Sequence, residues 1–195
     1  MYIKVNENNE ITDLFYNISN LNNDYPHVSF SSKLTSEQLV PYGIIQVKET
    51  QPPMLKIHQI SNITNPILID GVWTQNWLVL DISLDEAKIK YKNRVKQRRE
   101  DDEMAGFTYN GKEYDSDLKS IIRISNAAQV AVTNPNFSVF WTAKDNTESL
   151  LTGAELIELQ AALVAHISVI HINSRSLKQQ IDSATTLAEL ELIGV

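Results

Sequence analysis

Apolar positions follow a different pattern before and after about residue 83. Before it, they come in short runs rich in β-branched and aromatic residues, and the longest run spans 72–82. After it, they recur every three to four positions, which is the spacing of helices. The pattern predicts an α+β fold: a small β-rich amino-terminal unit, a bridging helix, and a helical carboxyl-terminal unit with a short β-hairpin insert.

Short strands between turn residues are predicted throughout residues 1–83. The runs 2–5 and 11–15 flank a polar turn, as in a loose hairpin, and the Asn- and Asp-rich residues 17–25 are expected to form a loop. A capping box at 35–38 predicts one short helix. Further strands are predicted at 44–48, 56–60, 66–70 and 72–82.

Residues 84–105 are predicted to form one polar helix. Ser83 opens it with a capping box, and Gly106 is suited to end it. Its main apolar stripe is Ala87, Tyr91 and Val95, which is narrow for a core helix. We therefore expect this helix to bridge two units, 1–83 and 106–195, or to pack one seam against a partner.

The last part of the chain is predicted to be mainly helical. The Asn-Gly turn at 110–111 indicates a tight hairpin over 107–114, and two strands are expected at 138–142 and 148–151. Helices are predicted at 118–132, 154–183 and 187–193.

The carboxyl half of the predicted helix 154–183 carries apolar residues without an obvious cover. The helix 118–132 is about half as long, so Ile170, Leu177 and Ile181 are predicted to meet another subunit. The alternative is that residues 187–193 fold back and seal this surface. Tyr91 and Val95 on the polar helix, and Trp73 and Trp77 on the strand 72–82, complete the predicted interface.

Composition narrows the range of functions. The chain has 195 residues and a net charge of −7, whereas a nucleic-acid-binding protein is usually basic. Cysteine is absent, which excludes disulfides and thiolate metal sites. No uninterrupted apolar run approaches the ~20 residues of a membrane span. We expect neither nucleic acid nor membrane as a partner.

No constellation typical of catalysis or metal binding emerges. His166 and His171 are five residues apart, whereas two helical ligands of one metal need a spacing of four. The acids at 101–103 follow basic residues, so the i, i+4 pairs 96/100, 98/102 and 99/103 are expected to screen one another. Trp73, Trp77 and Trp141 could form a sugar-binding platform, but core or interface positions are commoner for tryptophan. We expect no enzymatic activity, cofactor, metal or small-molecule substrate.

Several motifs in the last 90 residues resemble a known phage domain. They are Gly106 to Asp117, then Ser120 and Arg123, the segment 141–146, residues 151–152 with Leu156 and Leu159, residues 165–166, Leu177, Ile181 and the segment 184–186. Together they resemble the domain of unknown function at the carboxyl end of many tailed-phage tail-fibre and tail-fibre-assembly proteins. The stretch 70–86 is similar to the amino-terminal part of the same proteins.

The resemblance implies a non-enzymatic tail protein. Such a protein would be a structural component at or beside the tail fibre or distal tail, made in the host cytoplasm and retained in the virion tail. Its partners would be other tail or tail-fibre proteins, and it could also form a homo-oligomer. The alternative is an assembly chaperone for the tail fibre that does not remain in the virion.

Overall fold

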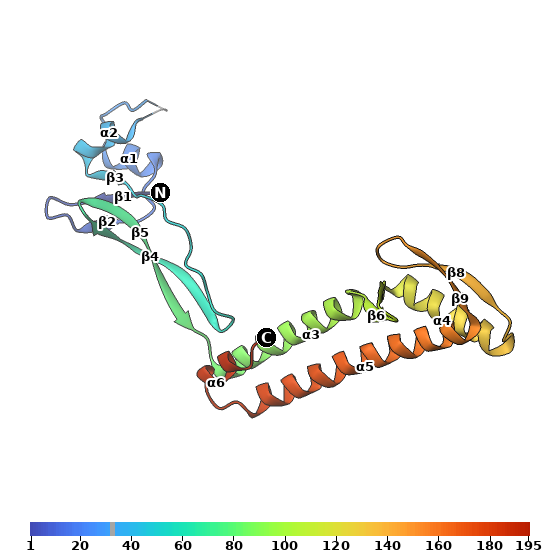
Figure 1. The fold of residues 1–195 in the computed structure, drawn as a ribbon. Coiled ribbons are helices and arrows are strands. Elements are labelled where there is room, and N and C mark those ends of the chain that lie inside the picture. The colour runs from blue at the N-terminus through green and yellow to red at the C-terminus, as the bar shows by residue number, and fades with distance from the viewer. Residues whose placement is uncertain (32–33) are drawn as a thin grey trace. The chain divides into compact units, whose positions relative to one another are not determined.

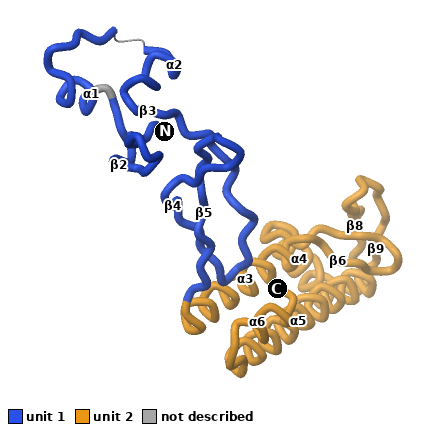
Figure 2. Tube along the Cα trace, turned by 90° about the vertical axis from the view of Figure 1, so that its left-hand side faces the viewer, with its two compact units in different colours: residues 1–82 blue, residues 83–195 orange. Residues whose placement is uncertain are grey.

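The chain forms two compact units. A computed structural model describes residues 1–31 and 34–195, with unit 1 spanning residues 1–82 and unit 2 spanning residues 83–195 (Figures 1 and 2). Unit 1 is built mainly from strands, and unit 2 is mainly helical with two short hairpins. The predicted α+β class is therefore confirmed.

The first part of unit 1 is a three-stranded antiparallel sheet with short helices. Its strands lie in the order β2-β1-β3, and four side chains form a small buried core: Tyr16, Leu21, Leu39 and Ile44. The elements are β1 (Tyr2–Val5), β2 (Ile11–Asp13), α1 (Ile18–Asp24), α2 (Ser36–Leu39), the 3-10 turn η1 (Val40–Tyr42) and β3 (Ile44–Gln46).

Helix α1 corrects the loop predicted at residues 17–25. The Asn17 side chain accepts hydrogen bonds from the N–H groups of Ser19 and Asn20. The Asn20 side chain accepts one from the Asn17 N–H in return. Asparagine is as good an N-cap as serine, so this Asn-rich stretch starts a helix.

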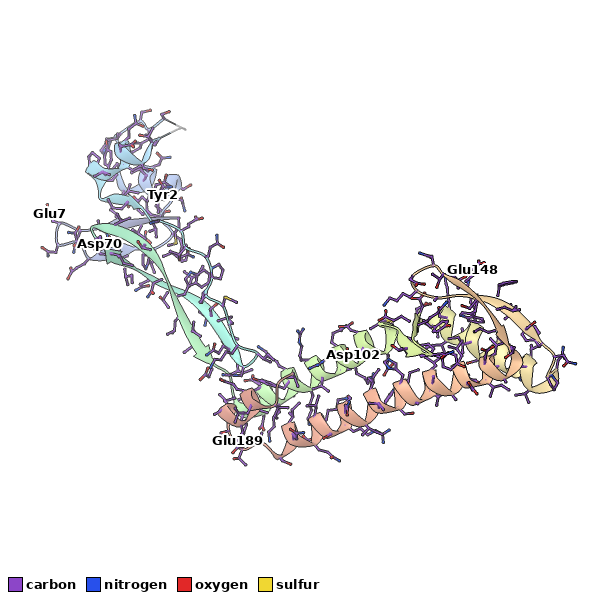
Figure 3. All side chains as sticks on the ribbon, in the orientation of Figure 1. Tyr2, Glu7, Asp70, Asp102, Glu148 and Glu189 are labelled. Atoms are coloured by element: carbon purple, nitrogen blue, oxygen red, sulfur yellow. The ribbon has the colours of Figure 1, made fainter. Side chains whose placement is uncertain are left out.

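The rest of unit 1 is a long two-stranded hairpin, β4 (Gln59–Ile69) and β5 (Val72–Asp81). The two separate strands predicted at 56–60 and 66–70 are wrong, because β4 is continuous. Its pairing with β5 shifts between Thr64 and Ile67, so Asn65 and Pro66 form a bulge inside the strand. Asp70 and Gly71, both with positive φ, make the turn, and Figure 3 shows Asp70 at this end of the hairpin.

Unit 2 consists of four helices and two hairpins. The hairpins pair β6 with β7 and β8 with β9, in the order that the sequence predicts. The elements are α3 (Leu84–Met104), β6 (Phe107–Tyr109), β7 (Lys112–Tyr114), α4 (Leu118–Thr133), β8 (Ser138–Thr142), β9 (Glu148–Thr152), α5 (Gly153–Ser183) and α6 (Leu187–Leu192).

Helix α5 is the longest helix of unit 2, and two other helices pack against different parts of it. α4 and α3 both pack against it, and they follow one another along it (Figure 1). The helix predicted at 84–105 to bridge two units is therefore part of unit 2, where it packs against α5. α3 packs along α5 and supplies part of the cover that the length of 118–132 alone left missing.

The core of unit 2 lies where α4, α5 and the hairpins meet. Leu156, Leu159 and Leu163 of α5 are at most 2% exposed. They pack with aromatic and aliphatic side chains from the other elements: Phe107, Tyr114, Ile124, Ala131, Ala143 and Leu151. Sequence-distant elements are thus joined through one face of α5.

The carboxyl end of α3 is fastened to the segments that follow it. The fully buried Ser116 accepts a hydrogen bond from the Gly106 N–H at 2.9 Å and donates one to the Glu103 carbonyl at 2.5 Å. Lys144 donates to the Ala105 carbonyl at 2.6 Å. These donors satisfy carbonyls that a helix end leaves without partners.

Among the described residues, α5 is the one helix long and apolar enough to cross a membrane. The sequence contains no uninterrupted apolar run of that length, but Glu158 is the one acidic or basic residue between Leu156 and Asn173, apart from two histidines. The core helix of a soluble protein meets the same criterion, and α5 packs against α3 and α4 here.

Candidate protein-interaction surface

Three of the predicted interface residues lie inside unit 2. Ile181 has no exposed surface, and Tyr91 and Val95 are 3% and 2% exposed. Tyr91 and Val95 belong to the buried stripe of α3, the helix that packs against α5. The prediction that these three residues contact another subunit is therefore wrong, because the chain itself covers them.

Ile170 and Leu177 are half-buried and line a hollow of about 420 Å³ between α3 and α5. Arg98, Arg99 and Ser174 lie in the same lining. Most of this lining is polar, so it does not form the continuous apolar strip that the sequence suggested. The buried Ser174 occupies the position where the stripe is interrupted in the sequence.

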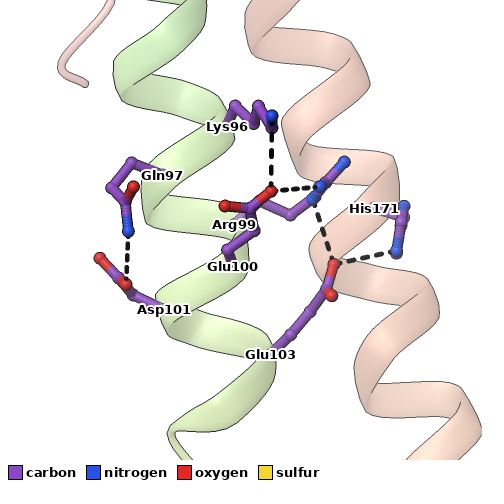
Figure 4. A network of polar contacts seen from close by, with 7 residues as sticks. All are labelled: Lys96, Gln97, Arg99, Glu100, Asp101, Glu103 and His171. Atoms are coloured by element: carbon purple, nitrogen blue, oxygen red, sulfur yellow. Dashed lines mark hydrogen bonds and ion pairs between the residues drawn. The ribbon is translucent and has the colours of Figure 1, made fainter.

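A polar network crosses the same pair of helices (Figure 4). Glu103 Oε1 lies 2.9 Å from His171 Nε2 and 3.2 Å from Arg99 Nε. Glu100 lies within ion-pair distance of Arg99 and Lys96, at 3.2 and 3.9 Å. The three predicted i, i+4 pairs are all present, with Arg98 and Asp102 3.8 Å apart. These charged side chains pair with one another, either within α3 or between α3 and α5.

The three tryptophans belong to different units. Trp141 packs on the core of unit 2, while Trp73 and Trp77 lie half-buried on β5 of unit 1. The Trp77 indole N–H donates a hydrogen bond to Thr50 Oγ1 at 3.0 Å, which fixes the ring against the segment before β4. Trp73 and Trp77 remain on the same face of β5, as their spacing predicts.

The β4–β5 hairpin carries the largest group of exposed apolar side chains in unit 1. Paired residues share a face, so the strand register assigns each side chain to one of two faces. We call one the aliphatic face; it contains Ile60, Ile67, Ile69, Val72, Leu78 and Leu80. The other, the tryptophan face, contains Ile63, Leu68, Trp73, Trp77 and Val79. Nine of these side chains, all except the tryptophans, are 39–49% exposed.

The hairpin is almost free of charge. From Gln59 to Leu80, Asp70 at the turn is the one acidic residue, and Lys and Arg are absent. Exposed strands are usually protected by charged side chains, above all lysine, against pairing with other chains. This hairpin lacks that protection on both faces, which is typical of a surface that contacts protein.

One edge of the hairpin is occupied and one is open. Lys48 pairs with β5 through hydrogen bonds with the Trp73 carbonyl, at 2.8 Å, and the Gln75 N–H, at 2.9 Å. Thr50 Oγ1 donates to the Gln75 carbonyl at 3.2 Å. Within the described ranges, no other strand pairs with the outer edge of β4.

The sequence contains a pattern that indicates apolar side chains on both faces of the hairpin. Consecutive apolar residues at 67–69 and 77–80 break the alternation of a strand with one buried face. Such runs are typical of strands covered on both faces. Only the two tryptophans were predicted as contacts, because the remaining residues are common in ordinary strands.

A second cavity, of about 310 Å³, lies within unit 2 beside α4 and β8. Its lining includes Asp115, Ser120, Arg123, Trp141 and Lys144, which all belong to the motifs that resemble the phage domain. Two of their polar groups are engaged locally: Ser120 donates to Asp117 at 2.6 Å, and Lys144 to the Ala105 carbonyl. The structure gives these two residues a role in holding the fold.

Metal-binding groups are not gathered anywhere in residues 1–31 and 34–195. No cluster of three or more His, Asp or Glu side chains is placed there to share an ion. His166 and His171 lie on α5, where His171 pairs with Glu103 and the His166 ring lies 6.3 Å from that of Phe107.

Fold and surface define a two-unit α+β protein whose helical carboxyl-terminal unit is closed around α5. A family model for a domain of unknown function (DUF4376) matches residues 86–193, more than half of the chain, and the chain belongs to this family. The matched range begins in the first turn of α3 and ends just after α6. No curated protein and no solved structure matches the chain.

Proposed function

We propose that this chain is a non-enzymatic phage tail protein, a structural component at or beside the tail fibre or distal tail. It acts by protein–protein contacts, and the β4–β5 hairpin is the contact surface. The observation that carries this proposal is the hairpin itself, which exposes nine apolar side chains on two faces. The resemblance of residues 106–193 to the phage domain supplies the setting.

The organisation of unit 2 supports a scaffold role. Its core is closed, and its helices begin at side-chain caps: Ser83, Asp117, Thr152 and Thr186. A unit of this kind is suited to hold a fixed shape beside a contact surface. In this proposal the chain needs no cofactor, metal or small-molecule substrate.

An assembly chaperone that leaves before the virion is complete is the second candidate. The same uncharged hairpin fits this role, because a chaperone must cover apolar surface of an unfinished fibre protein. Both candidates place the chain in the host cytoplasm during assembly. They differ in whether it remains in the tail.

Quantitative mass spectrometry of purified particles from the phage that encodes this chain tests both candidates. A fixed number of copies per tail supports the structural component. Absence from particles, combined with loss of fibres when the gene is deleted, supports the chaperone. Normal, infectious particles without the chain would contradict both.

A further inference from the structure

The β8–β9 hairpin of unit 2 has an unpaired edge along β8. Among the described residues, no third strand pairs with this hairpin. The Ala143 N–H donates to the Thr147 carbonyl at 2.9 Å, so these two residues form a hydrogen-bonded pair. Hydrogen-bonded and non-hydrogen-bonded pairs alternate in an antiparallel ladder. The backbone N–H and C=O groups of Ser138, Phe140 and Thr142 therefore point away from β9, toward the open edge.

The cavity of about 310 Å³ beside α4 follows this edge. Its lining contains the five consecutive residues from Val139 to Ala143, but no residue of β9. A cavity over one face of a strand meets every second side chain, because successive side chains point to opposite faces. A lining of consecutive residues places the cavity at the edge instead. Helix α4 contributes Ser120 and Arg123 to the same lining.

A segment outside the hairpin already bonds to its backbone next to the cavity. The Lys144 N–H, directly after the five lining residues, donates to the Glu113 carbonyl of β7 at 2.9 Å. The chain then passes from β7 to Asp115, which lines the cavity as well. Within the described ranges, the backbone of 138–142 has no such strand beside it on this side.

The cavity is a positively charged place in an acidic protein. Arg123 and Lys144 line it together with one acidic residue, Asp115, whereas the whole chain has a net charge of −7. Lys144 is engaged, since its Nζ donates to the Ala105 carbonyl at 2.6 Å. Arg123 forms no ion pair with any described residue, because the nearby Asp117 carboxylate accepts the N–H groups at the start of α4. Its guanidinium group is therefore available for another carboxylate.

The two faces of β8 define the pattern of any strand added beside it. Val139 and Trp141 pack on the core of unit 2, and the Val139 partner Leu151 is buried. Phe140 and its partner Leu150 lie on the opposite face and are 68% and 53% exposed. An added strand continues this alternation, so a side chain that faces α4 is followed by one that lies beside Phe140.

We propose that the open edge of β8 binds an extended, acidic peptide segment of another protein, with a carboxylate of that segment on Arg123. The segment becomes a third strand, and its backbone pairs with the outward groups of Phe140 and Thr142. Its acidic side chain faces α4, and apolar side chains at alternate positions lie beside Phe140. This site belongs to unit 2 alone and does not depend on the proposed role in a phage tail.

Charge favours a different protein over a second copy of this chain. Two copies related by a two-fold axis would pair β8 with β8. The strand, Ser138–Thr142, contains no acidic residue. Such a pair would leave Arg123 of both copies without a counter-charge, whereas an acidic segment supplies one.

Two substitutions separate strand addition from attraction of charge. Thr142→Pro removes an N–H that points to the open edge, and the ladder with β9 keeps its hydrogen bonds, as is usual for proline in edge strands. Thr142→Val keeps the N–H and is its control. Arg123→Glu reverses the charge at the site. Its control is Arg175→Glu on the exposed surface of α5, outside the cavity lining.

The probe is an mRNA-displayed library of random peptides of about eight residues, long enough for one strand, selected on the full chain. Enriched peptides should contain Asp or Glu with apolar residues at alternate positions. Fluorescence anisotropy then measures a synthetic peptide of the enriched sequence. Thr142→Pro and Arg123→Glu should each weaken its binding at least tenfold, whereas Thr142→Val and Arg175→Glu should bind as the wild-type chain does. Circular dichroism checks that each variant is folded.

Methylation of the peptide's backbone nitrogens tests the strand without any change to the protein. In an added strand, every second N–H of the peptide pairs with β8. Methylation should therefore weaken binding at least tenfold at alternate positions and have little effect between them. This measurement decides the question if Thr142→Pro does not fold.

Other outcomes overturn the proposal. Selection that enriches no peptide contradicts it, as does an enriched peptide that Arg123→Glu binds as tightly as the wild-type chain does. Methylation effects without a period of two would mean that Arg123 binds a carboxylate without strand addition. A wild-type dimer that Thr142→Pro dissociates would assign the edge to a second copy. The presence of the chain in purified particles tests the proposed function separately.

Discussion

The main apolar stripe of unit 2 is buried, whereas many apolar side chains of unit 1 are exposed. In unit 2, the stripe of α5 is turned inward, and Leu156, Leu159 and Ile181 have no exposed surface. In unit 1, a small buried core that includes Tyr16, Leu21, Leu39 and Ile44 lies next to the sheet, while nine apolar side chains of the hairpin remain 39–49% exposed. The inward stripe of α5 is therefore covered more completely than the hairpin, although unit 2 also exposes apolar side chains outside that stripe, such as Phe140 at 68% and Ile172 at 62%.

The largest expected effect is the loss of stability when a buried leucine of α5 is removed. Leu159→Ala should lower the free energy of unfolding by about 2–5 kcal/mol, since it leaves a cavity in a closed core. Leu192→Ala, at a side chain that is 87% exposed, is the control and should cost less than about 0.5 kcal/mol. Urea denaturation followed by circular dichroism at 222 nm measures both. Equal losses would show that the Leu159 side chain is no better covered than the exposed Leu192 side chain.

Removing a buried hydrogen bond in unit 2 should have an intermediate effect on the free energy of unfolding. Ser116→Ala removes the hydroxyl between the Gly106 N–H and the Glu103 carbonyl and should cost about 1–3 kcal/mol, because a buried amide loses its partner. Hydrogen exchange should show faster opening at residues 103–106. Ser138→Ala, at an exposed strand position, is the control. Unchanged exchange at the end of α3 would contradict the role of Ser116.

Acid should weaken unit 2 by a smaller amount. Hydrogen bonds from Ser83, Thr152 and Thr185 lower the pKa values of Glu86, Glu155 and Glu189 from the ordinary 4.5. A carboxyl with a lowered folded pKa stabilises the fold above its unfolded pKa, and this contribution is lost as pH falls through the folded pKa. The temperature at the midpoint of thermal unfolding should therefore decrease as the pH is lowered below about 4.5.

Glutamine at the same positions separates this effect from general acid denaturation. Glu155→Gln keeps a hydrogen-bond acceptor but cannot titrate, so its thermal midpoint should fall less between pH 5 and pH 3. Circular dichroism of both proteins over this range gives the comparison. Parallel curves for the two proteins would mean that Glu155 does not contribute to the acid sensitivity.

Local signals predicted most elements, whereas long-range pairing could not be predicted. The capping box at Ser83 predicted the start of α3 correctly, because a cap depends on four neighbouring residues, and the structure shows the same motif at Thr152 before α5. The stripe of Ala87, Tyr91 and Val95 was also visible, and all three are buried. What the stripe packs against is decided some 80 residues later, and no local pattern carries that information.

The candidate surface shows the same division. Trp73 and Trp77 were selected for their size, and they do lie on one face of the hairpin. The predicted residues Tyr91, Val95 and Ile181 are buried, because the packing of α3 against α5 supplies the cover that the sequence left unassigned. The continuity of β4 was hidden by Asn65 and Pro66, which usually mark turns and here form a bulge.

The sharing of α5 between two helices has a consequence for the order of folding. α4 and the β8–β9 hairpin precede α5 directly, so their contacts close short loops, whereas the contact between α3 and the end of α5 closes one of about 80 residues. At a synthesis rate of about 5–20 residues per second, α3 emerges roughly 4–16 s before its partner. During this interval its apolar stripe has no cover from α5. The α3–α5 contact should then form after the α4–α5 contact.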